Sequence, residues 1–107
     1  MNAELLKGHL DLLLLAIIAE RPAHGYAIIA CLRERSAGAF DLPEGTVYPA
    51  LHRLERAGLL QSRWAPGAGR SRRIYEITAL GAEAMQERRA TWGAFARGVQ
   101  AVLGGAL

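Results

Sequence analysis

Three arginines stand close together in the segment Gly69-Arg70-Ser71-Arg72-Arg73, which contains no acidic residue. A guanidinium group donates paired hydrogen bonds to phosphate oxygens, so such a cluster favours binding to a polyanion. The wider stretch 44–73 holds six arginines and two glutamates, whereas the rest of the chain holds seven basic and eight acidic residues. The excess positive charge therefore lies in one continuous stretch, a distribution typical of a nucleic-acid contact.

A second group of polar residues lies just upstream, in the stretch 44–57. Its apolar residues Val47, Leu51 and Leu54 recur at helical spacing and predict a buried stripe. The residues that avoid this stripe and form the opposite surface are Thr46, Tyr48, Pro49, His52 and Arg53. Their hydroxyl, imidazole and guanidinium groups suit phosphates and base edges, so we expect this surface to bind DNA. The neighbouring Glu55 and Arg56 are expected on an ordinary solvated face.

Tyr26 is a further candidate for a DNA contact. It follows His24 and Gly25 at the start of a predicted second helix. Backbone N–H groups at a helix start can bind phosphate. Gly25 equally fits a tight turn without any role in binding, and the pattern does not decide between the two.

The chain of 107 residues must position these groups with few elements. Apolar spacing and breakers predict helices over 5–19, 25–35, 44–57 and 79–103, and strands over 59–64 and 72–77 joined by the loop 65–69. Asp41-Leu42 is a candidate for a very short strand. Pro49 leaves two alternatives, a third helix that runs through this proline or one that begins at it.

This order of elements predicts a winged helix, a mainly α fold with a small β-hairpin. In such folds the third helix lies in the major groove of DNA, and the hairpin contacts the flanking backbone or minor groove. We expect residues 1–78 to form the DNA-binding domain and residues 79–107 to form a dimerisation helix. The first helix, residues 4–19, is apolar nearly all round, so we expect a second subunit to cover part of it.

The final predicted helix has the apolar pattern of a short coiled-coil seam. Met85, Trp92 and Val99 are seven residues apart, as are Phe95 and Val102. With Leu6, Leu10 and Leu13 of the first helix, they predict a homodimer interface, although a monomer could fold the stripe onto its own core. Twofold symmetry would place two reading helices about 34 Å apart and predicts a pseudo-palindromic DNA site. Two copies of Trp92 near the axis could hold a planar aromatic molecule or simply fill the interface.

The sequence contains no motif that indicates a catalytic or metal-binding site. His9, His24 and His52 fall on different elements at no metal-ligand spacing, and Cys31 is the only cysteine, expected as a buried apolar thiol. We therefore expect no enzyme activity, no metal and no cofactor. The longest apolar run, 12–19, is too short to span a membrane, so the cytoplasm is the expected location. The alternative function is a helical dimer that binds another protein instead of DNA.

The sequence resembles PadR-type regulators over nearly its whole length. The resemblance rests on Leu6-Lys7-Gly8-His9-Leu10-Asp11, on His24-Gly25-Tyr26, on residues 44–51 followed by Arg53-Leu54-Glu55, and on the hairpin 69–78. It implies a dimeric DNA-binding protein of the short subgroup, usually a repressor released by a small aromatic or phenolic effector at the dimer interface. It also implies that the third helix continues through Pro49 and that Tyr48 and the hairpin arginines face DNA.

Overall fold

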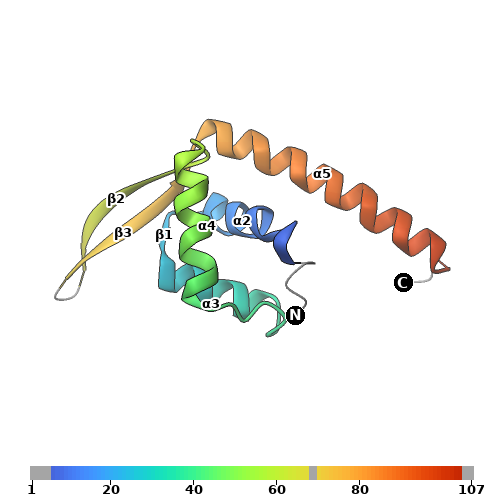
Figure 1. Cartoon of the computed structure of the whole chain (residues 1–107), viewed down its shortest axis with the longest axis horizontal. Coiled ribbons are helices and arrows are strands. Elements are labelled where there is room, and N and C mark those ends of the chain that lie inside the picture. Colours follow the sequence, from blue (N-terminus) through green and yellow to red (C-terminus); the bar gives the residue numbers. More distant parts are fainter. Residues whose placement is uncertain (1–5, 68–69, 105–107) are drawn as a thin grey trace.

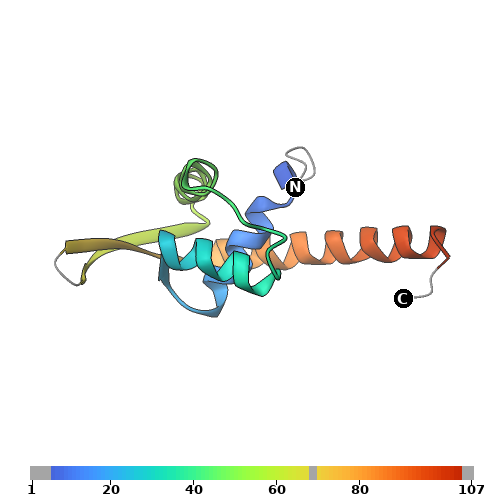
Figure 2. The same ribbon diagram turned by 90° about the horizontal axis from the view of Figure 1, so that it is seen from below.

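The computed structural model describes residues 6–67 and 70–104, and this part of the chain contains four helices and a three-stranded antiparallel sheet (Figure 1). The elements are α2 (Leu10–Glu20), β1 (Ala23–His24), α3 (Gly25–Arg35), α4 (Glu44–Arg56), β2 (Leu60–Gly67), β3 (Arg70–Ile77) and α5 (Ala79–Val102). The prediction of a mainly helical winged helix is confirmed. The hairpin of β2 and β3, called the wing below, and the distal half of α5 extend from opposite ends of the molecule (Figures 1 and 2).

Helix α2 is the centre of the hydrophobic core. Leu14, Leu15 and Ile18 are buried, and α3, α4, α5 and β3 all contact this helix. Its nearly continuous apolar surface is therefore covered largely by its own chain, while Leu12, Leu13 and Ala16 stay only partly buried. The helix begins at Leu10 because Gly8 and His9 form a turn, whereas the predicted helix began several residues earlier, in a segment partly outside the described residues.

Helices α3 and α4 form the helix-turn-helix. Helix α3 has the predicted bounds, and the Nδ1 atom of His24 accepts a hydrogen bond of 3.3 Å from the backbone N–H of Ala27 at its start. Helix α4 runs unbroken through Pro49, which excludes a helix that begins there. Proline leaves the carbonyl of the residue four positions earlier without a donor. That residue is Gly45, which is exposed in the first turn of the helix.

The sheet has the strand order β1-β3-β2. Strand β1 pairs Ala23 with Tyr75, so the third strand lies between the first two predicted helices, where no strand was expected. The prediction of a short strand at Asp41-Leu42 is wrong. The wing strands are longer than predicted, since β2 continues through Pro66 to Gly67 and β3 begins at Arg70. Pro66 is tolerated because β2 is an edge strand. Ala68 and Gly69, part of the predicted loop, lie outside the described residues.

Helix α5 begins as predicted, with the Thr78 side chain accepting a hydrogen bond of 3.0 Å from the N–H of Gly81. Leu10 and Met85 were predicted at a dimer interface, but both are buried in the protomer's own core. Beyond Met85 the helix leaves that core, and an apolar stripe on it stays exposed: Trp92, Phe95, Val99 and Val102.

Gly81 fixes the start of α5 against the corner between α4 and β2. A Cβ atom at this position would overlap with the carbonyl oxygen of Leu59 and lie 2.8 Å from Cγ1 of Ile77. The backbone of Leu59 cannot easily move, because its N–H donates to Leu54 and its carbonyl accepts from Thr78. We therefore expect Gly81→Ala to lower the free energy of unfolding by about 3 kcal/mol, measured by chemical denaturation.

The matched control is Gly93→Ala in the same helix, where the nearest atom is the end of the flexible Arg97 side chain. This change should stabilise the protein by up to about 1 kcal/mol, because alanine favours a helix more than glycine does. Equal stability of the two variants would contradict the close packing at Gly81.

Candidate nucleic-acid interface

Helix α4 presents an exposed stripe on the side opposite its buried residues. Val47, Ala50, Leu51 and Leu54 face the core. The exposed residues of the stripe are spaced four, three and four apart: Gly45, Pro49, His52 and Arg56. Arg56, expected only on a solvated face, therefore lies on the same stripe as His52. A helix with one anchored apolar face and one exposed polar face has the shape that enters the major groove.

A groove of about 350 Å³ joins α4 to the wing and to the start of α3. The residues that line it are His24, Gly25, Tyr26, Tyr48, His52, Trp64, Arg72, Arg73 and Tyr75. The structure thus brings together five of the predicted contact residues, namely Tyr26, Tyr48, His52, Arg72 and Arg73. Thr46, Pro49 and Arg53 do not line this groove. The backbone of Arg70 lies in β3, but its side chain is outside what the structure describes.

Tyr48 and Gly25 pack directly against each other at one end of the groove. A Cβ atom on Gly25 would overlap with the phenol ring of Tyr48, and Gly25 does not have a positive φ. The glycine therefore makes room for Tyr48 and is not required by a tight turn. The ring of Tyr26 meets Tyr48 edge-on, with 6.5 Å between centroids. Burial, and to a lesser extent the charge of Glu44, raises the pKa of Tyr48, so its hydroxyl remains a hydrogen-bond donor.

Arg73 is held in a fixed position by the wing and by α4. Its Nε donates to Oγ of Ser62 at 2.8 Å, and its Nη2 lies 3.9 Å from a carboxylate oxygen of Glu55. Its guanidinium also lies over the ring of Trp64, 5.1 Å from the centroid. The sequence indicated no acid near the wing arginines, and for Arg73 this is wrong, because α4 places Glu55 beside it.

Arg72 has a weaker partner than Arg73. Its Nη1 lies 2.9 Å from Nε2 of His24, whose Nδ1 already accepts from the N–H of Ala27. A neutral imidazole accepts at only one nitrogen, so it cannot accept from both Ala27 and Arg72. The guanidinium of Arg72 is therefore poorly satisfied where it lies and is well placed to bind an anion.

Trp64 is a groove residue that the sequence analysis missed. It lies in β2, its side chain is 65% exposed, and it stacks on Arg73. An exposed indole next to an arginine can pack on a sugar or a base as well as on the guanidinium. The signal in the sequence was a tryptophan directly after Arg63 in a basic hairpin.

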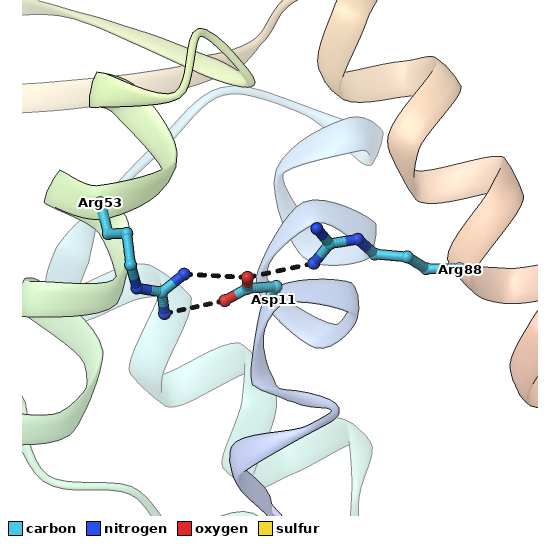
Figure 3. Close-up of polar contacts among 3 residues, drawn as sticks. All are labelled: Asp11, Arg53 and Arg88. Carbon is cyan, nitrogen blue, oxygen red and sulfur yellow. Dashed lines mark hydrogen bonds and ion pairs between the residues drawn. The ribbon is translucent and has the colours of Figure 1, made fainter.

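Arg53 points to a different part of the molecule from the groove residues. Its two terminal nitrogens bond both oxygens of Asp11, at 2.9 and 3.0 Å, and Arg88 of α5 bonds Oδ2 of Asp11 at 3.0 Å (Figure 3). Burial would raise the pKa of Asp11, but the hydrogen bonds and charges of the two arginines lower it overall. The sequence predicted that Arg53 contacts DNA; in the structure its guanidinium is instead held by a carboxylate of α2.

The described residues also bear on the expectations for metal ligands, Cys31 and membrane-spanning segments. Within residues 6–67 and 70–104, no three His, Cys, Asp or Glu side chains are grouped so that they could hold a metal ion. Cys31 is half-buried, not fully buried as expected. No helix in the described part of the chain has both the length and the apolar character needed to cross a membrane.

Comparisons with known proteins agree with this arrangement. The model of the Transcriptional regulator PadR-like family matches residues 14–87. The chain is 39% identical to the transcriptional regulator Rv3488 of Mycobacterium tuberculosis, over 81% of this chain and 76% of that protein. Among solved structures, a PadR family regulator from Eggerthella lenta matches with a TM-score of 0.82 and 34% identity, over 96% and 88% of the two chains. A PadR-like regulator from Bacillus cereus matches with a TM-score of 0.84 and 28% identity, over 97% and 100%. The chain belongs to the PadR-like family of transcriptional regulators.

Proposed function

We propose that this regulator is a cytoplasmic homodimeric repressor that binds a pseudo-palindromic site in double-stranded DNA. The observation that carries the proposal is the single groove that Tyr48 and His52 of α4 share with Arg72 and Arg73 of the wing. In this proposal the exposed stripe of α4 enters the major groove, with Thr46 at its flank, and the wing arginines bind the flanking phosphates.

The homodimer is supported by the apolar stripe on the distal half of α5. Phe95 is 62% exposed and Val102 is 87% exposed, so the protomer leaves much of this stripe in water. Helix α5 has 24 residues and is about 36 Å long. We propose that a second copy covers its stripe, with the half-buried Leu6 and Leu13 at the edge of the contact.

An aromatic effector is supported by a second cavity, of about 600 Å³, between the start of α2 and α5. Its walls include His9, Arg88, Trp92 and Phe95, and the rings of His9 and Trp92 meet edge-on at 5.2 Å. This size and this lining suit a planar aromatic molecule. In a Trp64→Phe variant, where Trp92 is the remaining tryptophan, a panel of planar aromatic dyes should quench the emission and weaken DNA binding. A dimer whose emission no dye changes would contradict the effector proposal.

The DNA-binding proposal is tested by the salt dependence of binding to a labelled random-sequence duplex, followed by fluorescence anisotropy. Two wings that each use Arg72 and Arg73 would neutralise about four phosphates, so log K should fall against log salt with a slope near –3.6. A dimer that binds no duplex, or binds it independently of salt, would contradict the proposal and would favour the alternative of a protein partner.

A further inference from the structure

Asp11 lies where three helices meet. It is on α2, it accepts two hydrogen bonds from Arg53 of α4, and its Oδ2 atom is shared with Arg88 of α5 (Figure 3). Its side chain is only 19% exposed, whereas those of Arg53 and Arg88 are about half exposed. One carboxylate therefore links the helix that carries the proposed base contacts to the helix that carries the proposed dimer contacts.

The Asp11 contacts add a directional link to the apolar packing of the three helices. Helix α2 contacts both α4 and α5, and Leu14, Leu51 and Met85 belong to one buried core, whose burial is favourable but not directional. A paired guanidinium–carboxylate contact, in contrast, is directional and fixes both the distance and the plane of its partners. The Asp11 contacts are thus suited to set the angle between α4 and α5.

A small change in that angle has a large effect at the far end of α5. Arg88 and Val102 are 14 residues apart in the helix, which corresponds to about 21 Å. A tilt of about 5° at Arg88 would move Val102 by about 2 Å. In a dimer formed through this end of α5, such a shift would change the separation of the two α4 helices.

We propose that Asp11 is a positioning residue for DNA recognition, which holds α4 at a fixed angle to α5 and so sets the half-site spacing that the dimer accepts. This inference rests on the proposed function, because it requires a dimer that binds two half-sites. Arg53 then acts through Asp11 and not through a base edge.

The proposal predicts that Asp11→Asn changes the affinity for random DNA and the preference for half-site spacing in opposite directions. Asparagine cannot hold two guanidinium groups as a carboxylate does, so the helix angle becomes loose. The loss of a negative charge also raises the net positive charge, which favours non-specific binding to DNA. We therefore expect affinity for a random duplex to stay equal or rise, while preference for the correct half-site spacing falls about tenfold.

The experiment measures the affinity of the full chain for its selected DNA site, for the same site with one base pair added or removed between the half-sites, and for a random duplex. The variants are Asp11→Asn, Arg53→Gln and their combination. Because Asp11→Asn already disturbs the contact that Arg53→Gln removes, the double variant should lose no more spacing preference than Asp11→Asn alone. Glu83→Gln and Arg89→Gln, at exposed positions of α5, make the same charge changes and should keep the preference.

Thermal unfolding of each variant separates positioning from stability. Should Asp11→Asn fail to fold, Arg53→Gln and Arg88→Gln at the more exposed partners carry the test, and each should reduce the spacing preference. Unchanged spacing preference in these variants, or additive losses in the double variant, would overturn the positioning role and leave DNA binding intact. A wild-type protein that binds no DNA would instead overturn the proposed function and this inference with it.

Discussion

Replacing Arg72 and Arg73 together by alanine should lower the affinity for every DNA sequence by about 100-fold and should also flatten its salt dependence. The Nη1 atom of Arg72 faces Nε2 of His24, which cannot accept from it while Nδ1 accepts from Ala27. Arg73 is held at the groove by Ser62, Trp64 and the more distant Glu55. The guanidinium of Arg72 is therefore available to a phosphate, and that of Arg73 can reach one by giving up its long contact with Glu55. In a dimer the change removes four guanidinium groups. The part of the slope of log K against log salt that these groups supply should therefore be lost.

The control for this prediction removes the same charge at a distance from the groove. Arg89 and Arg97 lie on α5 and are exposed, so replacing both by alanine changes only the general electrostatic attraction. We expect this variant to lose less than about fivefold in affinity. Affinity is measured by anisotropy over a series of salt concentrations, and unfolding curves confirm that the wing variant remains folded. Equal losses in the two variants would show that overall charge, and not the groove, binds the DNA.

Replacing Phe95 and Val99 together by aspartate should convert the protein to a folded monomer and reduce affinity for its DNA site by about 1,000-fold. Both side chains are exposed in the protomer and lie beyond Met85, so the protomer's core does not depend on them. At an interface they would be buried, where an unpaired carboxylate is strongly unfavourable. The affinity falls because a monomer binds only one half-site, whereas the two linked subunits of a dimer bind both half-sites together.

The measurement for this prediction is sedimentation equilibrium together with DNA titration. Ala90→Asp with Gln100→Asp provides a matched control, since both positions are exposed and lie on the other side of α5. The control should remain dimeric and bind DNA with nearly normal affinity. A Phe95/Val99 variant that stays dimeric would show that the subunits associate through another surface.

Local patterns predicted the helices well. The bounds of α3, the buried stripe of α4 and the start of α5 depend on residues near one another in the sequence, and all agree with the structure. The family resemblance also indicated that α4 passes through Pro49, which local rules alone left undecided. The position of Gly45 in the first turn already made this alternative physically reasonable, and in the structure Gly45 is exposed to solvent.

The features that the sequence did not predict depend on pairs of residues far apart in the chain. Strand β1 exists because Ala23 pairs with Tyr75, and no local pattern of two residues reveals such a pairing. No local pattern reveals the contact of Asp11 with Arg53, which are 42 residues apart, or the contact of Glu55 with Arg73 either. Charge counting along the chain therefore overestimated how many arginines are available to DNA.

The selection of bound sequences from a random DNA pool tests the central claim most directly. If α4 and the wing form one DNA-binding surface that a symmetric partner duplicates, the recovered sites should be inverted repeats with half-site centres about one helical turn apart, roughly 34 Å. Each site should bind two chains. Recovery of no preferred sequence, or of a single asymmetric half-site bound by one chain, would contradict this claim.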